Sequence, residues 1–362
     1  MDSDVNAAYS TRMHLIGHSL ALPLISATDF EPKSKHFFRS LSGLAEVPKQ
    51  GLAFGISESS NLRTSSILYH RSAALEAEAM CSGHIVLMDE TYSVRKTLLP
   101  EHRGISLDFH GSQIFNGGKT AAVLEYFPVQ VDMSSRGVRR GLGWAFDGVF
   151  KEIDFESGKA LFEWHSIGHL PVSESHVRPR LEIGSGLSVG MPWDYFHINS
   201  VDNYPNGDYL ISARHSDCIY KILEKDGSVI WRLGGEFSSF TLHGFYFSAK
   251  HDARLRLTPT GQEQISFYNN AWGGDEGRTR NYSTAMLINI DTSSKPMLAS
   301  LVKEWLPSHG GLARHQGNVQ YLPNGNVFIG CGGIPQFSEF TPEGERVLDV
   351  AFTDQTLRNY RV

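Results

Sequence analysis

The stretch that decides the fold is MPWDYFHINSVDNYPNGDYLISARHSDCIYKILEKDGSVIWRLGG, residues 191–235. Its β-branched and aromatic runs alternate with the turn pairs Asn206-Gly207 and Asp226-Gly227. Such pairs are the strongest short-range signal of a β-hairpin, because both central residues of a type I′ turn need positive φ. Four short antiparallel strands in a stretch of this length predict one propeller blade. The predicted strands are Tyr195–Val201, Tyr209–Ala213, Cys218–Leu223 and Val229–Leu233.

The composition favours a large, turn-rich β protein. The chain has 362 residues, 35 glycines and a net charge of −6. Its length suits one large all-β domain or two ordinary domains, and its glycine content suits a turn-rich β protein. Because no basic stripe follows the pattern of a phosphate backbone, we expect no nucleic-acid partner. No apolar run of about 20 residues occurs, so we expect no membrane partner.

Strand and turn patterns recur along the chain. The outer hairpins recur as EIDFESGKALFEW, YKILEKDGSVIWRL and EFTPEGERVLDVAF. This repetition predicts an all-β, six-bladed β-propeller, whose sixth blade must come from the irregular N-terminal region. We therefore expect an N-terminal arm or incomplete blade at residues 1–50 and a β-propeller domain at residues 51–362. The other predicted strands are Leu52–Ile56, Ser65–Tyr69, His84–Met88, Tyr92–Leu98, Ser106–Phe115, Thr120–Phe127, Val149–Phe155 and Ala160–Trp164, with further blades at Ala249–Trp305 and Gln316–Phe352.

Three segments lack strand patterns. The Ala/Glu content of Leu75–Met80 predicts a helical turn or an insertion. A Gly/Arg-rich loop is expected between Phe127 and Val149. The long segment His165–Gly190 contains Pro171, Pro179 and several Gly and Ser. Long loops in compact domains are usually functional or flexible, so we expect this one to cover an end of the channel.

Histidines fall at blade-spaced positions. The innermost strand of each blade lines the channel of a propeller, so equivalent positions in different blades meet. His110, His197 and His251 lie at roughly blade-length intervals, and Arg214 follows His197 closely enough to return to the same end of the channel. We expect these four side chains in one central pocket. Histidine is the side chain most easily recruited to acid–base or nucleophilic work near neutral pH.

Several motifs in these blades resemble those of the arylsulfotransferase-type propeller family, chiefly its fungal branch. They are DYFHINSVDN, NGDYLISARHS, DGSVIWRLGG, KHDARL, PNGNVFIG and FSEFTPEG, and the resemblance runs from about Ser106 to Phe352. It implies a sulfuryl transfer from one phenolic sulfate to another phenol through a sulfated histidine, without a nucleotide sulfate donor. By the resemblance, His251 matches the nucleophile, and His110, His197 and Arg214 match the residues that hold the sulfate.

The residue types suit that chemistry. A sulfuryl group in transfer spreads negative charge over three oxygens, as a phosphoryl group does, and N–H donors in a dry channel stabilise that charge. Arg214 offers a planar fork of donors with a permanent charge. A neutral imidazole at His251 can attack sulfur, and a second imidazole can take the proton of the acceptor phenol.

Four more residues are candidates for substrate binding: Asn199, Lys250, His215 and His315. Lys250 stands where the family usually has Gln, so its ammonium either lowers the pKa of His251 or points away. The segment RNYSTAML at residues 280–287 replaces a more usual Ser-Arg-Gly segment. We expect neither a metal nor a cofactor. The cysteines lie far apart without metal-ligand spacing, at Cys81, Cys218 and Cys331.

Three functions are open at this point. The first is the sulfotransferase. The second is a cyclase or pericyclase of secondary-metabolite biosynthesis, which would catalyse a Diels–Alder-type cycloaddition with His and Arg as hydrogen-bond donors and no covalent intermediate. The third is a non-enzymatic binding propeller, which the polar channel residues disfavour. Both enzymes would act on a small aromatic or phenolic molecule, and the sequence does not indicate an oligomeric state.

The N-terminal segment bears on localisation. His14–Ala27 is apolar, follows Arg12 and ends in small residues, so it weakly resembles a secretory signal peptide. Two histidines and a proline interrupt it. We favour a cytoplasmic location and leave secretion open.

Overall fold

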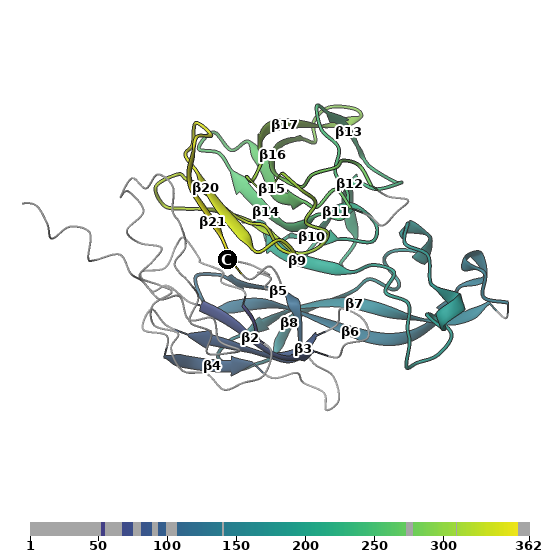
Figure 1. Ribbon diagram of the computed structural model, residues 1–362. Helices are drawn as coiled ribbons and strands as arrows, with labels where there is room; N and C mark the ends of the chain where they lie inside the picture. The colour runs from purple at the N-terminus through teal and green to yellow at the C-terminus, as the bar shows by residue number, and fades with distance from the viewer. Residues whose placement is uncertain are drawn as a thin grey trace, which may run out of the picture.

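The structure is a computed structural model that describes most of the chain between residues 52 and 353 (Figure 1). The predicted arm at residues 1–50 and the predicted turn at Leu75–Met80 lie outside the described residues. Within the described part no α-helix forms, and no helix has the length and apolar character needed to cross a bilayer. The described residues are 52–54, 67–74, 81–88, 93–98, 107–139, 141–272, 278–308 and 310–353.

The stretch at residues 191–235 forms one four-stranded antiparallel sheet, as predicted. Its strands follow each other in the order β9, β10, β11, β12. Strand β9 begins later than the predicted Tyr195, because His197 has a φ of 52°, a left-handed conformation that interrupts an extended strand. The strands are β9 (Ile198–Asn203), β10 (Tyr209–Ala213), β11 (Cys218–Ile222) and β12 (Val229–Gly234).

Two later sheets repeat this pattern. One contains β14 (His251–Leu257), β15 (Glu263–Asn269), β16 (Thr284–Asp291) and β17 (Met297–Trp305), with β13 (Phe240–His243) added parallel to β17. The last contains β18 (Asn318–Tyr321), β19 (Val327–Gly330), β20 (Gln336–Phe340) and β21 (Arg346–Ala351).

The first sheet is larger than the other three. It holds β5 (Leu107–Phe115), β6 (Thr120–Asp132), β7 (Leu142–Asp154) and β8 (Ala160–His165). Strand β3 pairs with β5, so the N-terminal strands continue this sheet. The number of six blades is therefore not confirmed by the four sheets of the described residues. The N-terminal strands are β1 (Leu52–Phe54), β2 (Ile67–Ala74), β3 (Cys81–Met88) and β4 (Val94–Leu98).

The sheets are arranged as propeller blades. Strands β5, β9, β14 and β18 lie beside one another in this order, so they form the inner wall of the assembly. Between neighbouring sheets lie separate apolar clusters, each built from the facing sides of two blades. Trp231 belongs to the second cluster and Trp305 to the third, and both are almost fully buried. The all-β propeller architecture is thus confirmed.

A long ribbon replaces the Gly/Arg-rich loop that we expected between Phe127 and Val149. Strands β6 and β7 pair without interruption from Thr120↔Asp154 to Asp132↔Leu142, and the ribbon extends away from the centre of the molecule (Figure 1). A short 3₁₀ turn, η1 (Ser134–Arg136), closes it. The prediction was wrong because it weighed the glycines and arginines at the tip above the alternating residues on either side.

The segment His165–Gly190 packs along this ribbon. It contains two 3₁₀ turns, η2 (Val172–Glu174) and η3 (Leu181–Ile183). The Arg136 guanidinium donates to the carbonyls of Val172, Ser173 and Ser175 at 2.7–3.1 Å. On the other side, the backbone N–H of His176 donates to the carbonyl of His215 at 3.0 Å. The segment therefore links the ribbon to a predicted site residue.

We expect Arg136→Gln to loosen this segment. The change removes hydrogen bonds from a charged donor to three carbonyls, and the free energy of unfolding should fall by about 1–3 kcal/mol. Urea denaturation monitored by tryptophan fluorescence measures it. Arg139→Gln, an exposed arginine of the same ribbon, is the matched control and should stay within about 0.5 kcal/mol of the wild type. Equal effects of the two changes would contradict the anchoring role of Arg136.

Candidate active site

Histidines mark the starting ends of the inner strands. His110 lies in β5, His197 immediately precedes β9, and His251 is the first residue of β14. His315 lies three residues before β18. The strand register is irregular beside each of the first three, which is the signature of a β-bulge. Bulges re-aim side chains, and here they occur at the same end of successive blades.

His110 is held by a carboxylate two residues earlier. Asp108 Oδ1 accepts the backbone N–H of His110 at 2.8 Å and lies 2.6 Å from its ring Nδ1. Both residues are buried. Because a carboxylate only accepts, Nδ1 carries the proton and Nε2 is the other face of the ring.

His197 and His215 share the carboxylate of Asp194. Its Oδ1 accepts the backbone N–H of His197 at 3.1 Å, and its Oδ2 contacts the ring Nδ1 of His197. The ring Nδ1 of His215 donates to the backbone carbonyl of Asp194 at 2.7 Å. The left-handed φ of His197 is a strained conformation for a residue with a side chain, and such strain is common at functional sites.

These pairs lie against each other and against Arg214. The ring centroids of His110 and His197 are 4.6 Å apart, and those of His197 and His215 are 4.7 Å apart. Arg214 Nη1 lies 3.1 Å from Nε2 of His215, and its Nη2 donates to the carbonyl of Arg314 at 3.0 Å. Three blades thus contribute to one polar cluster.

His251 contacts the loop before β18, the same loop that accepts a hydrogen bond from Arg214 at Arg314. Its Nδ1 lies 2.7 Å from Oδ1 of Asn270, and its Nε2 accepts the backbone N–H of Gln316 at 3.3 Å. The amide nitrogen of Asn270 donates to the carbonyls of Ala313 and Gln316, both at 2.8 Å. That amide orientation leaves Oδ1 as an acceptor, so Nδ1 of His251 carries the proton and Nε2 carries the lone pair.

Burial keeps these imidazoles neutral. It lowers the pKa of His251 well below its usual value, and the charge of Arg214 lowers it further. Burial, with His110 and the charge of Arg214 beside it, does the same to the pKa of His197. The pKa of His215 falls to about 3, again mainly through burial. At neutral pH the cluster therefore combines the cation of Arg214 with three uncharged imidazoles.

A family model for arylsulfotransferases (ASST) matches residues 77–353. The chain belongs to the arylsulfotransferase family. No curated protein matches it. The motif resemblance is thereby confirmed at the level of the family, whereas the fungal branch stays a prediction.

Solved structures with similar folds have little sequence in common with this arylsulfotransferase-family chain. A Bacteroides caccae protein of unknown function has 11% identity and a TM-score of 0.43, and the match covers 81% of this chain and 79% of that one. The propeller domain of Myceliophteria thermophila Cps50 (Swd1) has 11% identity and a TM-score of 0.44, with 86% and 89% covered. Virginiamycin B lyase from Staphylococcus aureus has 11% identity and a TM-score of 0.37, with 85% and 72% covered.

Lys250 and Asn199 connect two blades of the arylsulfotransferase fold. The side chain of Lys250 is fully buried, and its amine donates to the carbonyl of Ala213, the residue before Arg214. Asn199 donates its amide to the carbonyl of Lys250 at 2.8 Å. Burial lowers the pKa of Lys250 to about 8, opposed by Asp217 and Cys218 and assisted by Arg214. Both residues thus hold the loops of Arg214 and His251 together.

We expect Lys250→Met to stabilise the fold at neutral pH. The folded state holds the lysine pKa near 8 against 10.5 when unfolded, so folding a protonated lysine costs about 3 kcal/mol. In the wild type, stability should rise between pH 8 and 10.5, because there the unfolded chain carries a proton that the folded chain lacks. The variant should lose this rise, and its advantage of about 1–3 kcal/mol should shrink over the same window.

Urea denaturation at pH 7 and at pH 10 measures this difference. Lys303→Met is the matched control, because its amine also donates to a backbone carbonyl, that of Pro342, but on the exposed surface. A Lys250→Met protein that is less stable than the wild type at pH 7 would show that the hydrogen bond to Ala213 outweighs the burial of the charge.

The last predicted binding residue, His315, lies beside the cluster. Its ring packs against Gly333, where an added Cβ would come within 2.8 Å of its Cε1. Its backbone carbonyl accepts the N–H of Gly333 at 3.0 Å. The next residue, Gln316, has a left-handed φ of 65° and contacts His251. His315 therefore supports the loop that holds the His251 ring.

Asp194, His197 and His215 are close enough to be compared with a metal site. Their possible ligand atoms lie within 4.8 Å of one another. Hydrogen bonds within the protein account for this arrangement, since Nδ1 of His215 donates to a carbonyl and its Nε2 faces a guanidinium. A fixed positive charge beside the ligands disfavours a metal cation. The donor set does not fit a metal centre.

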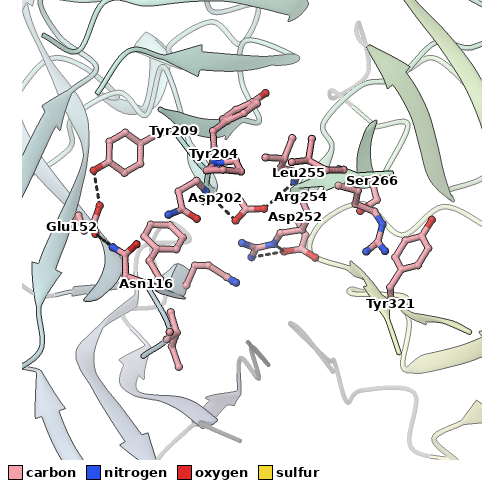
Figure 2. A pocket seen from close by; sticks show the side chains of 18 of the residues that line it. Asn116, Glu152, Asp202, Tyr204, Tyr209, Asp252, Arg254, Leu255, Ser266 and Tyr321 are labelled. Atoms are coloured by element: carbon pink, nitrogen blue, oxygen red, sulfur yellow. Dashed lines mark hydrogen bonds and ion pairs between the residues drawn. The ribbon is translucent and has the colours of Figure 1, made fainter. Parts of the chain in front are cut away.

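A cavity of about 1190 Å³ lies at the opposite ends of the inner strands (Figure 2). Its walls include the last residues of β5 and β9, the whole of β18, and β14 from Asp252, the residue after His251. In it Arg254 forms an ion pair with Asp252 at 2.7 Å and donates to the carbonyl of Val201 at 2.9 Å. This pair bridges two blades, which gives the two residues a structural role. None of the four predicted catalytic residues lines the cavity.

Sequence reasoning missed the partners that orient the rings. Asp108 precedes His110 by two residues and Asp194 precedes His197 by three, so a search for an acid shortly before each histidine would have found them. Asn270 and Gln316 come from other loops, 19 and 65 residues from His251. No local signal identifies them.

Proposed function

We propose that this protein transfers a sulfuryl group between phenolic compounds through a sulfated His251. The observation that carries the proposal is the state of the His251 ring. Its Nδ1–H is held by Asn270, its Nε2 bears the lone pair, and burial beside Arg214 keeps the ring neutral. A neutral, oriented imidazole is the form that can act as a nucleophile at neutral pH. Membership in the arylsulfotransferase family supports the same reaction class.

The first half-reaction forms the covalent intermediate. The Nε2 lone pair of His251 forms a bond to sulfur, the bond between sulfur and the phenolic oxygen breaks, and the electron pair leaves with the phenolate. The ring then carries a sulfuryl group on Nε2 and its proton on Nδ1, where Asn270 accepts it. The permanent charge of Arg214 stabilises the negative charge on the sulfuryl oxygens.

The second half-reaction needs a base. A neutral His197, oriented by Asp194, accepts the proton of the acceptor phenol on Nε2 while the phenolic oxygen attacks sulfur. The nitrogen–sulfur bond breaks and its electron pair returns to His251. His197 then releases this proton to solvent, which balances the phenolate released in the first half-reaction, so that one aryl sulfate and one phenol have exchanged the sulfuryl group. His110, oriented by Asp108, is positioned beside His197 for the same proton.

The test is an exchange assay with a chromogenic aryl sulfate and an acceptor phenol. We expect release of the chromogenic phenol, formation of the acceptor sulfate, and parallel lines in double-reciprocal plots, as a covalent intermediate requires. No nucleotide sulfate donor should be needed. Folded protein that transfers no sulfuryl group to any phenol would refute the proposal.

One observation favours the cyclase as a second candidate. The N–H of Gln316 already occupies Nε2 of His251 at 3.3 Å, the atom that must attack sulfur. A long hydrogen bond of this kind is weak and can open, but a cyclase would not need to break it. In that case Arg214 and the histidines would donate hydrogen bonds to a carbonyl of the substrate. Exposure to an aryl sulfate would then form no covalent adduct with the protein.

A further inference from the structure

The two loops that hold the His251 ring also carry an aromatic and basic group. Asn270 accepts the ring Nδ1–H, and Trp272 follows it by two residues. Gln316 contacts the ring Nε2, and Arg314 precedes it by two residues. The backbone carbonyl of Arg314 also accepts the Arg214 guanidinium at 3.0 Å. Trp272 and Arg314 are therefore carried by the same two loops that contact His251 and Arg214.

These side chains meet outside the buried cluster. The guanidinium carbon of Arg314 lies 4.6 Å from the ring centroid of Trp272, and that of Arg278 lies 5.5 Å from the same ring. Trp272 is half-buried, whereas Arg278 and Arg314 are exposed. An indole face with two guanidinium groups offers both a stacking surface and positive charge.

The positive charges of Arg278 and Arg314 are not neutralised by a carboxylate in the described part of the chain. No carboxylate of a described residue lies within ion-pair distance of Arg278 or Arg314, although the protein carries a net charge of −6. Two like charges on one ring repel each other, and a bound anion removes that repulsion. An aromatic anion satisfies the ring and the two cations together.

We propose that Trp272, Arg278 and Arg314 form an aryl-anion site at the mouth of the His251 cluster, and that its ligand class is the aryl sulfate. The aromatic ring stacks on the indole and guanidinium planes, and the anionic group contacts the two arginines before it passes inward to Arg214. This inference rests on the proposed function and specifies where its donor substrate first binds.

The experiment is a calorimetric titration with para-nitrobenzenesulfonate, whose carbon–sulfur bond prevents sulfuryl transfer. The neutral para-nitrobenzenesulfonamide measures binding without the charge. We expect Arg314→Gln and Trp272→Leu each to weaken binding of the sulfonate about 10-fold. Arg314→Gln should change binding of the neutral sulfonamide less than about 3-fold, because the sulfonamide carries no charge. Arg256→Gln is the matched control, because Arg256 lies over Tyr321 at 3.3 Å in the cavity at the other end. It should leave sulfonate binding unchanged.

Sulfonate affinity that is unchanged in Arg314→Gln, or reduced equally in Arg256→Gln, would overturn the site. The sequence also contains Asp275 and Glu276 between Trp272 and Arg278, outside the described residues. Sulfonate binding that appears only after Asp275→Asn and Glu276→Gln would overturn it too, because these acids would then be the natural partners of the arginines. The titration is independent of turnover. A protein that binds sulfonate as expected but transfers no sulfuryl group keeps this site and refutes the proposed reaction.

Discussion

His251→Asn should remove essentially all sulfuryl transfer while leaving the fold intact. The asparagine can still donate to Asn270 in place of the ring Nδ1–H, but it has no lone pair on nitrogen with which to attack sulfur. Losing a covalent nucleophile costs several orders of magnitude in kcat, because the remaining groups supply only binding and electrostatic help. In the cyclase the same change should cost about 10- to 1,000-fold, as the loss of one hydrogen-bond donor does.

Intact mass spectrometry after exposure to an aryl sulfate decides between the two mechanisms. The wild type should gain one sulfuryl group, and His251→Asn should gain none. His169→Asn is the matched control, because its ring stacks on Trp164 and takes no part in the cluster. It should keep the adduct and the activity. A wild-type protein that never gains the adduct and transfers nothing would shift the conclusion to the cyclase.

Asp194→Asn should slow the second half-reaction by about 100- to 10,000-fold. The carboxylate of Asp194 holds the proton on Nδ1 of His197, which leaves Nε2 free to accept the phenolic proton. An asparagine can present its N–H₂ group instead, and the ring then places its proton on Nε2, where it cannot act as a base. The effect should grow with the pKa of the acceptor phenol, since a more basic phenolic oxygen needs more help to lose its proton.

Single-turnover kinetics separate this effect from a general disturbance of the site. Formation of the sulfated enzyme from para-nitrophenyl sulfate should slow less than 10-fold, because nitrophenolate leaves without a proton. Asp147→Asn is the matched control, since Asp147 lies 2.7 Å from Nδ1 of His165 on an outer strand. It should lower stability and spare kcat. Equal slowing of both half-reactions by Asp194→Asn would show that Asp194 only supports the loop.

The fold prediction rested on local patterns of residues in the sequence. Tyr209–Ala213 was predicted and observed with the same limits, because the turn at Asn206-Gly207 and the run of β-branched and aromatic residues are both local signals. The ribbon of β6 and β7 was missed, since its pairing joins residues up to 34 positions apart and no turn pair marks its tip. The predicted number of six blades is not confirmed, because β3 pairs with β5 and joins the N-terminal strands to the same sheet.

The candidate site, too, was predicted from the sequence only in part. Blade spacing predicted that His110, His197 and His251 meet, and the short distance along the chain from His197 placed Arg214 beside them. The structure places His110, His197 and Arg214 in one contact network, and His251 and Arg214 contact the same loop at Gln316 and Arg314. Their catalytic role, the phenolic substrate and the expected absence of nucleic-acid and membrane partners stay predictions. The large cavity was not foreseen, because a void depends on how far neighbouring blades diverge at their ends.

The sequence by itself determined the all-β class, the blade at residues 191–235, the family and the histidines at successive blade starts, since each of these depends on neighbours along the chain. Only the tertiary structure decided which ring nitrogen of His251 bears the lone pair. That choice depends on Asn270 and Gln316, which reach the ring from separate loops. It also decided that these imidazoles are neutral. Their pKa values fall because neighbouring blades exclude water from them, and exclusion of water is a property of the packed fold rather than of any segment.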